Sequence, residues 1–480
     1  MNDLGTGQPV EPGRGSDADG SRRFPAGFVW GAGTSAYQIE GGVDLDGRLP
    51  SVWDTFAAAG HAGGDTGAVA ADHRRCMATD VGLMAELGLA AYRFSVAWPR
   101  VQPGGRGPAS AGGLDFYRAL VDELLGHGIE PIATLYHWDL PQDLEDAGGW
   151  PVRDTALRFA DYAALVGDAL GDRVRRWTTI NEPWCAAMLG YAGGIHAPGR
   201  TEPGAAVAAA HHLLLAHGLA VDALRARAGA GPADEIGFTL NPYPVVPRTG
   251  SAADREAARR IDGLANRLWY DAVLLGSYPD DVVGDLAAVS DLAHVRDGDM
   301  AVVARPVDAL GLNYYRCYHV AHAPGASATS EWPGSPDVAF TTAVDTPTSN
   351  GWPVEPRGVA DALVRLARDY DPPPLYVHES GGAFPDKVAP DGRIHDDDRL
   401  AYLDAHLRAA HDAIAAGVDL RGFFVWSLLD NFEWAEGFSQ RFGIVHVDFA
   451  TQRRTPKDSA LWYREVMAAN GLDSGSGTSP

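Results

Sequence analysis

The segment Arg176-Trp-Thr-Thr-Ile-Asn-Glu-Pro183 gives the first indication of both the fold and the chemistry of this chain. Residues 177–180 alternate apolar and β-branched side chains, a pattern typical of a short strand. Pro183 ends that strand, because proline lacks a backbone donor and restricts the residue before it. Asn181 and Glu182 therefore stand at the carboxyl end of a strand, where a parallel α/β barrel places an acid catalyst. The alternative is a loop glutamate near the start of a helix.

Short apolar runs of the same kind recur along the chain, and stretches with helical periodicity lie between them. The predicted strands are residues 28–32, 91–96, 131–136, 177–180, 236–240, 309–313, 375–378 and 422–426. The predicted helices are residues 79–87, 113–127, 153–170, 204–227, 251–274, 356–368 and 399–416. In the second helix Phe116, Leu120 and Leu124 recur at a spacing of four, and this face would be buried against a sheet.

Strands separated by helices predict right-handed βαβ units and a parallel sheet. Eight such units in about 450 residues predict an α/β protein with a (β/α)8 TIM barrel, a single domain with long βα loops. An open doubly wound sheet is the structural alternative. The domain is expected to span residues 24–470. Residues 1–23 and 471–480, which are rich in Gly, Ser, Asp and Pro, are expected to be disordered tails.

The bulk composition excludes some classes of partner. The chain has 480 residues, a net charge of −24 and only two lysines, Lys387 and Lys457. Nucleic-acid binding is therefore not expected, because phosphate contacts need clustered Lys and Arg. No apolar leader precedes residue 24 and no run of about 18 apolar residues is recognised, so we expect a soluble protein without membrane contact.

The cysteines indicate a compartment but no metal or redox site. Cys76, Cys185 and Cys317 are widely spaced, and no C-x-x-C motif occurs. Three such thiols favour a reducing environment, and a cytoplasmic location is expected. His211, His212 and His217 lie in one predicted helix, but not at the spacing of a helical zinc pair, so they are interpreted as surface or packing residues. The sequence predicts no metal and no cofactor.

A possible dinucleotide motif follows the first strand. Residues 31–36 read Gly-Ala-Gly-Thr-Ser-Ala, which matches G-x-G-x-x-A. A dinucleotide site needs a helix to open there, yet Gly41 and Gly42 leave room only for a short one. The favoured interpretation is a tight turn that lets Gln38 face a cleft.

Two further strands carry polar groups in apolar surroundings. Arg93 lies inside the predicted strand 91–96, and a buried guanidinium must be paired. Its two interpretations are a structural salt bridge and a cation that keeps a catalytic carboxylate ionised. His137 follows the strand 131–136, where it could donate a hydrogen bond to a substrate hydroxyl; the alternative is a core histidine bonded to backbone.

A second carboxylate at a strand end is the partner that Glu182 requires. Glu379 follows an apolar run and precedes Ser380, Gly381 and Gly382. Two carboxyl groups on different strand ends of one barrel suit glycoside hydrolysis, one as acid and the other as nucleophile or base. Near the C-terminus, Trp426 and Trp434 bracket Glu433, a combination that offers flat apolar faces and a hydroxyl acceptor to a sugar ring.

Taken together, these segments resemble the family 1 glycoside hydrolases, the β-glucosidase group. The resemblance extends from about residue 24 to residue 470. The motifs that carry it are Phe28-Val-Trp-Gly-Ala-Gly-Thr-Ser-Ala-Tyr-Gln-Ile-Glu-Gly41, Tyr92-Arg-Phe-Ser95, His137-Trp138, Thr179-Ile-Asn-Glu-Pro183, Asn313-Tyr-Tyr315, Glu379, the run from Trp426 to Trp434, and Arg441-Phe-Gly-Ile444.

The resemblance implies a retaining mechanism in which Glu182 is the general acid/base and Glu379 the nucleophile. Arg93 and Tyr315 would support the nucleophile and lower its pKa. Two carboxyl groups in such an enzyme lie roughly 5–5.5 Å apart. The resemblance assigns substrate binding to Gln38, His137, Trp138, Asn181, Asn313, Tyr315, Trp426, Glu433, Trp434 and Phe442. Asn181 would donate to the sugar's 2-hydroxyl.

The expected substrates are small β-glucosides or oligosaccharides without a phosphate, because Glu433 would repel a 6-phosphate. An acid/base that is Glu, in place of the Gln of the plant thioglucosidases, favours an O-glycosidase. The family's usual Thr-Glu-Asn-Gly is replaced by His378-Glu-Ser-Gly381, which leaves the setting of the nucleophile and the aglycone open. Other interpretations are a galactose or fucose preference, transglycosylation, a non-catalytic sugar-binding barrel, and an NAD-dependent oxidoreductase. The sequence leaves the oligomeric state unknown.

Overall fold

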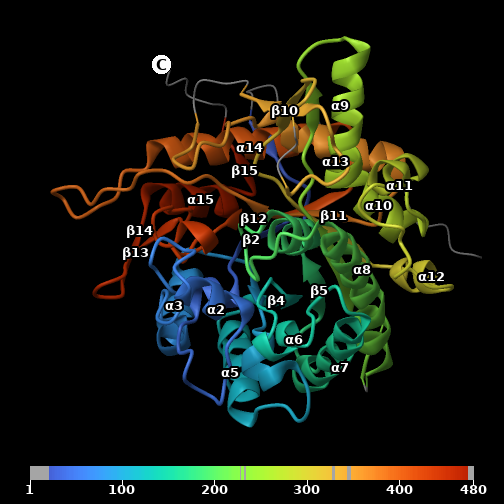
Figure 1. Ribbon diagram of the computed structural model, residues 1–480. Helices are drawn as coiled ribbons and strands as arrows, with labels where there is room; N and C mark the ends of the chain where they lie inside the picture. Colours follow the sequence, from blue (N-terminus) through green and yellow to red (C-terminus); the bar gives the residue numbers. More distant parts are fainter. Residues whose placement is uncertain (1–20, 228, 232–233, 327–329, 343–346, 474–480) are drawn as a thin grey trace, which may run out of the picture.

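The computed structural model describes residues 21–227, 229–231, 234–326, 330–342 and 347–473. At its centre eight parallel strands form a closed barrel (Figure 1). In order around the barrel they are β2 Val29–Gly33, β3 Ala91–Ser95, β4 Glu130–Tyr136, β5 Arg176–Asn181, β6 Glu235–Leu240, β8 Ala309–Asn313, β11 Leu375–Ser380 and β12 Leu420–Trp426. These are the eight predicted strands, each within two residues of the predicted bounds. The (β/α)8 barrel is confirmed, and the open doubly wound alternative is wrong.

The barrel strands are short and buried because both of their faces are covered. In β3 and β8 every residue is buried, since alternate side chains point into the barrel and toward the helices. The glycines of the first strand are needed for this packing. A Cβ at Gly31 would come within 2.3 Å of the Phe424 ring. The glycines of the G-x-G-x-x-A motif thus admit side chains of β12, and only the four-residue helix α1 Ala36–Ile39 follows them.

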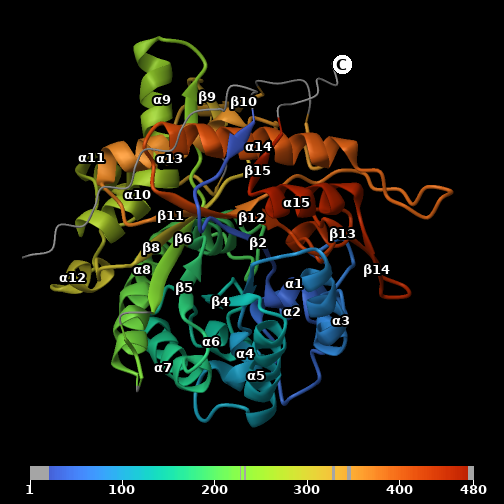
Figure 2. The same cartoon turned by 180° about the vertical axis from the view of Figure 1, so that it is seen from behind.

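The long helices cover the barrel from outside. They are α3 His73–Glu86, α5 Ala111–Gly126, α7 Arg153–Leu170, α8 Pro203–Ala226, α9 Ala252–Asp262, α13 Arg357–Tyr370, α14 Asp397–Ala415 and α15 Asp458–Ala469. In α7 the buried residues Phe159, Tyr162, Val166 and Leu170 recur at three and four, as the sequence predicted. Helices α5, α7 and α8 lie side by side on one side of the barrel, and α13, α14 and α15 on the other (Figures 1 and 2).

Two predicted helices differ from the observed ones. The helix expected from residue 79 already begins at His73, whose Nδ1 lies 2.8 Å from Asp80 Oδ2; Arg454 of a distant strand also donates to Asp80, at 2.7 Å. The helix predicted over residues 251–274 is one continuous helical run, but two π-helical segments interrupt its α-helical pattern: it consists of α9, the π-helical η3 Gly263–Arg267, α10 Leu268–Tyr270 and the π-helical η4 Asp271–Leu275. Arg365 of α13 binds Asp262 where α9 ends, at 2.8 Å through Nη2. Hydrophobic periodicity does not predict such contacts between distant segments.

The remaining short helices lie in the loops and at the rim. They are α2 Val52–Ala58, α4 Trp98–Val101, η1 Pro103–Gly105, α6 Gln142–Asp146, the π-helical η2 Cys185–Gly193, α11 Asp280–Leu286, α12 Asp299–Val303 and η5 Trp434–Glu436. Small sheets complete the fold: β7 Val245–Pro247 with β9 Tyr318–His322 and β10 Val338–Thr341, and β13 Val445–Asp448 with β14 Arg453–Pro456. The first of these sheets packs with α9 at one edge of the molecule (Figure 2). None of these sheets was predicted.

The predicted tail boundaries require a correction. Strand β1 Arg22–Arg23 pairs antiparallel with β15 Gly471–Leu472, so the two ends of the domain are tied together. The Phe24 amide also donates to the Asn470 carbonyl at 3.0 Å. These residues are ordered because each supplies the other's backbone partners. The rest of the predicted tails, residues 1–20 and 474–480, lies outside the described residues.

Helix α8 corrects the expectation that the chain has no long apolar run. Among the described residues it alone is long and apolar enough to cross a membrane. However, 78% of its most apolar window is buried within the protein, where it packs against α7, η2 and β5. Its His211, His212 and His217 are buried with it, so they are packing residues.

Candidate active site

A cavity of about 770 Å³ opens at the carboxyl ends of the barrel strands. Nine of the predicted site residues line it: His137, Trp138, Glu182, Tyr315, Glu379, Trp426, Glu433, Trp434 and Phe442. They come from strands far apart in the chain, which the barrel brings to one rim. Arg93, Asn181, Asn313 and Gln38 are buried behind this lining and hold it in place.

Glu182 has only uncharged donors around it. It directly follows β5 with a positive φ of 45°, and its amide donates to the Thr239 carbonyl at 3.0 Å, which fixes this bend. Asn313 Nδ2 donates to Glu182 Oε1 at 2.7 Å, and Cys185 Sγ donates to Oε2 at 3.2 Å. Burial, with the charge of Glu379 added to it, raises the pKa of Glu182 to about 8. Such a carboxyl group is protonated at neutral pH.

Glu379, in contrast, accepts hydrogen bonds from a cation and from a phenol. Arg93 Nη1 donates to its Oε1 at 2.6 Å, and the Tyr315 hydroxyl donates to its Oε2 at 2.7 Å. The sequence predicted that these donors would lower the pKa of Glu379. Burial is the larger effect and raises that pKa, while Arg93 and Tyr315 oppose the rise. Because Glu182 has no cation of its own, Glu379 is the carboxyl group of this pair that ionises first.

An amide relay connects the two carboxyl groups. Asn181 Oδ1 accepts from Arg93 Nη2 at 2.6 Å and from Asn313 Nδ2 at 3.0 Å. Asn313, predicted to bind substrate, is committed to Glu182 and Asn181 through its Nδ2 and does not line the cavity. The relay therefore fixes the orientation of both glutamates through residues of β3, β5 and β8.

His137 lines the cavity, and one of its ring nitrogens has no partner among the described residues. Burial, followed by the charge of Arg93, lowers the pKa of His137 well below its usual value, so the ring is neutral. Asn181 has its oxygen occupied, so its Nδ2 is the donor to His137 Nε2 at 3.2 Å. In that tautomer the proton lies on Nδ1, which is buried without a partner among the described residues. That this donor meets a substrate hydroxyl stays a prediction.

A third carboxyl group lies beside the pair. Gln38 Nε2 donates to Glu433 Oε2 at 3.2 Å and to the Phe432 carbonyl at 3.0 Å. Burial and the charge of Glu379 raise the pKa of Glu433 to about 8. Gln38 was predicted to face a cleft; it is fully buried and holds Glu433 at the cavity wall.

Aromatic rings form the surface next to these groups. The His137 ring stacks on Trp426 at a centroid distance of 5.7 Å and on Trp434 at 5.9 Å. Trp138 contacts Trp434 at 4.6 Å, and its Nε1 donates to the Asn181 carbonyl at 3.0 Å. Phe442 meets the ring of Tyr315 at 6.1 Å on the other side. Flat apolar rings beside carboxyl and amide groups suit a ligand with one apolar face and many hydroxyls, which is a sugar ring.

Sequence reasoning missed the outer part of the cavity. Its lining there is aromatic, with one guanidinium that lies over the rings of Tyr318 and Trp352 at 5.0 and 4.7 Å. The residues concerned are Trp184, Tyr243, Arg316, Tyr318, Trp332, Phe340 and Trp352. Trp184 and Cys185 could have been found, because they directly follow the Asn-Glu-Pro motif. Of the others, Tyr318 and Phe340 belong to the short strands β9 and β10 and the rest to loops, all in segments without a periodic signal.

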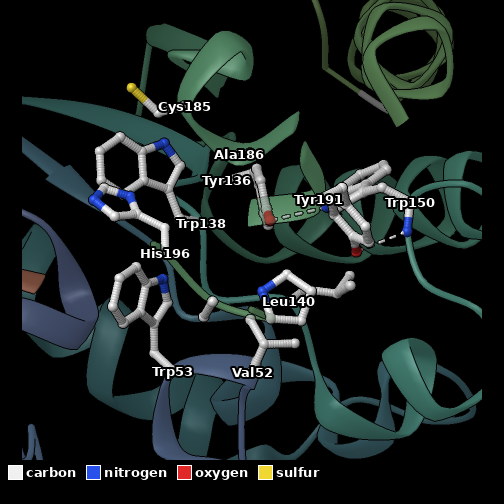
Figure 3. A pocket seen from close by; sticks show the side chains of 12 residues that line it. Val52, Trp53, Tyr136, Trp138, Leu140, Trp150, Cys185, Ala186, Tyr191 and His196 are labelled. Atoms are coloured by element: carbon white, nitrogen blue, oxygen red, sulfur yellow. Dashed lines mark hydrogen bonds between the residues drawn. The ribbon is translucent and has the colours of Figure 1, made fainter. Parts of the chain in front are cut away.

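A second, small cavity lies directly beside the first (Figure 3). Trp138, Cys185 and His196 line both cavities. The far wall of the small cavity is held by Trp150, whose Nε1 donates to the Tyr136 hydroxyl at 2.9 Å. The side chain of Cys185 thus forms part of a thin wall between the catalytic cavity and an apolar space.

His378, the unusual neighbour that precedes Glu379, is bonded within the barrel interior. His378 is buried inside the barrel, where its Nδ1 lies 2.8 Å from Thr239 Oγ1. Burial lowers the pKa of His378 well below its usual value, so it adds no charge next to the nucleophile candidate. Gly311 leaves the space for this ring, since a Cβ there would lie 2.1 Å from His378 Nδ1. The histidine that departs from the family's motif is therefore accommodated in the barrel interior.

No group of three or more His, Cys, Asp or Glu in the described part of the chain could hold a metal ion. His211 contacts Asp299 Oδ2 at 2.9 Å, and His217 contacts Thr179 Oγ1 at 2.7 Å, so these histidines have structural partners.

A (β/α)8 barrel with two dissimilar carboxyl groups at its carboxyl rim, beside sugar-sized aromatic surfaces, defines a glycosidase. The model of glycosyl hydrolase family 1 matches residues 20–472. The chain belongs to this family and is an O-glycoside hydrolase. The dinucleotide-dependent and non-catalytic alternatives are therefore wrong.

Several named relatives are similar to this chain over nearly its whole length. Thermostable β-glucosidase B of Thermobispora bispora is 51% identical over 473 residues, which covers 96% of this chain and 94% of the relative. A bifunctional β-D-glucosidase/β-D-fucosidase of Bifidobacterium breve is 46% identical, covering 93% and 98%. Among solved structures, the psychrophilic β-glucosidase of Micrococcus antarcticus has a TM-score of 0.90 at 48% identity, with 93% of this chain and 98% of that chain covered. A β-glucosidase of Thermotoga maritima in complex with deoxynojirimycin has a TM-score of 0.89 at 41% identity, covering 94% and 100%.

Proposed function

We propose that this protein hydrolyses the terminal, non-reducing β-D-glucosyl residue of small β-glucosides with retention of configuration. The observation that carries the proposal is the unequal pairing of the two glutamates. Glu379 is held by Arg93 at 2.6 Å, while Glu182 has only neutral donors and a pKa of about 8. One carboxyl group is thus prepared as an ionised nucleophile and the other as a proton donor.

In the first step a carboxylate oxygen of Glu379 attacks the anomeric carbon. The bond from that carbon to the aglycone oxygen breaks, and the proton of Glu182 passes to the departing oxygen. Arg93 and Tyr315 position the attacking carboxylate, and the Asn313 amide holds Glu182 toward the cavity. The product is a glycosyl ester of Glu379, which carries no charge.

In the second step Glu182 acts as a base. Loss of the Glu379 charge removes one cause of the raised pKa of Glu182, so Glu182 remains ionised and accepts a proton from water. The water oxygen attacks the anomeric carbon and the ester bond to Glu379 breaks. An acceptor alcohol in place of water would give transglycosylation by the same steps.

Glucose is the favoured glycone, and fucose is a second candidate. Glu433 and His137 line the cavity and offer an acceptor and a donor to ring hydroxyls, while Gln38 holds Glu433 in place from behind. The relatives named β-glucosidase support glucose, and the relative from Bifidobacterium breve is named for both β-D-glucosidase and β-D-fucosidase activity. Solved relatives bind deoxynojirimycin and isofagomine lactam, which supports small sugar-like ligands.

A cytoplasmic location is part of the proposal. Cys76, Cys185 and Cys317 are all free, which is the expected state in a reducing compartment. Fractionation of the source cells with activity assays tests this location independently of the mechanism.

A panel of nitrophenyl glycosides tests the function. We expect hydrolysis of the β-glucoside, weaker hydrolysis of the β-fucoside, and no hydrolysis of α-glycosides. NMR spectroscopy of the first-formed sugar should show the β-anomer. An α-anomer as first product would contradict retention, and turnover of α-glucosides alone would contradict the glycone assignment.

A further inference from the structure

The thiol of Cys185 lies against the proton-carrying oxygen of the acid/base candidate. Cys185 is the first residue of η2, three positions after Glu182, and its Sγ donates to Glu182 Oε2 at 3.2 Å. Asn241 Nδ2 donates to the same sulfur at 3.4 Å and to the Tyr243 hydroxyl at 3.1 Å. Because Asn241 occupies a lone pair of the sulfur, the S–H bond is left to point at Glu182.

This cysteine is not placed to react covalently. It is buried, and burial followed by the charge of Glu182 raises its pKa well above the usual value. A thiolate is the reactive form of cysteine, so this side chain remains a neutral thiol. Its chemistry is limited to weak hydrogen bonding, in which it can both donate and accept.

The two oxygens of Glu182 therefore have partners of different kinds. Oε1 accepts from the Asn313 amide at 2.7 Å, and that donor cannot become an acceptor. The acidic proton consequently belongs on Oε2, where the thiol can accept from it. When Oε2 loses the proton to the leaving group, rotation about the Cβ–Sγ bond lets the thiol donate to the carboxylate.

We propose that Cys185 is a positioning residue that stabilises the ionised form of Glu182 and keeps its Oε2 directed into the cavity. Asn241 assists by fixing the sulfur. The inference deepens the proposed function and rests on it, since it assumes that Glu182 changes its protonation state in each half of the reaction.

The wall position of Cys185 permits a matched pair of variants. Cys185→Val removes the donor, and Cys185→Thr keeps a hydroxyl donor in a side chain of nearly equal shape. Cys317→Val is the control, because Cys317 is also buried, lines the same catalytic cavity, and has the Tyr314 hydroxyl at 3.4 Å as its partner.

The pH profile of kcat/KM with phenyl β-glucoside gives the first readout. Its basic limb reports the loss of the Glu182 proton. In Cys185→Val we expect this limb to move upward by roughly half a unit to one unit, because the carboxylate loses a donor. Cys185→Thr and Cys317→Val should keep the wild-type limb. An unmoved limb in Cys185→Val, or an equal shift in either of the other variants, overturns the proposal.

The second readout uses 2,4-dinitrophenyl β-glucoside, whose leaving group departs without a proton. Its kcat then depends on Glu182 as a base, and the acidic limb of kcat should also move upward in Cys185→Val. A uniform loss of kcat without movement of either limb would show a merely structural role and contradict the inference. If Cys185→Val failed to fold, Cys185→Ala and Cys185→Ser would repeat the comparison.

Failure of the proposed function is distinguishable from failure of this inference. If the wild type hydrolysed no β-glycoside, the function would be wrong. The contact could still be measured by 13C NMR titration of labelled glutamate, with the Glu182 signal assigned through Glu182→Gln. The expected result is the same upward shift in Cys185→Val, and an unchanged titration would overturn the contact's role.

Discussion

Two clusters of buried or half-buried charged groups behave differently. The active-site cluster has three carboxyl groups and one cation: Glu182, Glu379, Glu433 and Arg93. The second, which we call the balanced cluster, has three carboxyl groups and three cations: Asp386, Asp396, Asp430, Arg399, Arg441 and Lys457. In the balanced cluster Lys457 Nζ donates to Asp430 Oδ1 at 2.8 Å, and Arg441 Nη1 donates to Asp430 Oδ2 at 2.6 Å.

The pKa values follow this balance. Burial raises the pKa of Asp430, but the charges of Lys457 and Arg441 outweigh it and hold that pKa below its usual value. In the active-site cluster burial prevails, and the pKa values of Glu182 and Glu433 rise to about 8. A shortage of cations is thus what distinguishes the functional cluster from the structural one, although both are buried and hydrogen-bonded.

The largest effect is expected from removal of Glu379, the carboxylate that is paired with Arg93, the only cation of the active-site cluster. Glu379→Ala should lower kcat/KM by at least about 10⁴-fold, because no covalent intermediate can form. Added azide should restore turnover and give α-glucosyl azide, the inverted product. Glu331→Ala is the control, since Glu331 also lines the cavity but, among the described residues, has no hydrogen bond or ion pair with either catalytic candidate, and it should retain activity. Wild-type turnover in Glu379→Ala would show that the two glutamates have been assigned wrongly.

Removal of Glu182 should lower the rate less than removal of Glu379, and the size of the loss should depend on the leaving group. In Glu182→Ala, hydrolysis of phenyl β-glucoside should fall by roughly 10²–10⁴-fold, the usual contribution of general acid catalysis. The first step with 2,4-dinitrophenyl β-glucoside should fall far less, because that leaving group needs no proton. Azide should give β-glucosyl azide, the retained product. An equal loss for both substrates in single-turnover assays would contradict the acid role.

A substitution in the balanced cluster should lower the stability of the fold and leave catalysis unchanged. Lys457→Met leaves Asp430 and Asp386 short of a cation at buried positions, and we expect a loss of about 3–5 kcal/mol in the free energy of unfolding. Urea denaturation measures this loss, and kcat/KM of the folded fraction should stay near the wild-type value. Lys387→Met is the matched control, because the chain's other lysine is exposed and should change stability by less than about 0.5 kcal/mol. A large loss of kcat/KM without a loss of stability would remove the distinction between the clusters.

The smallest effect is expected from the phenol beside Glu379. Tyr315→Phe removes the donor to Oε2, and kcat/KM should fall about 10- to 100-fold, as for a hydrogen bond to a charged group. Since the donor stabilises the carboxylate, its loss raises the pKa of Glu379, and the acidic limb of kcat/KM should move to higher pH. Tyr314→Phe is the control, because the Tyr314 hydroxyl donates to the Glu355 carbonyl at 2.7 Å. A limb that moves equally in both variants would assign the shift to packing.

The sequence alone determined the barrel and the two glutamates. Each barrel strand is a short run buried on both faces, so its apolar residues are contiguous and visible without an alignment. Glu182 and Glu379 could be predicted because strand ends and proline or glycine punctuation are local features. Their positions at ends of parallel strands then placed both at one rim.

Tertiary structure alone decided what each polar group does there. Asn313 bonds Glu182 across 131 positions of the chain, a role without a local signal. Arg93 reaches Glu379 across 286 positions; its place in an apolar strand predicted a paired cation, but only the fold selected its partner. Arg93 and Tyr315 lower the pKa of Glu379, as the sequence predicted, but burial by many segments at once is the larger effect and raises it. The pairing of β1 with β15 and the aromatic outer wall likewise depend on contacts between distant segments. Periodicity reports which face of an element is apolar, but desolvation and hydrogen-bond partners are properties of the folded neighbourhood.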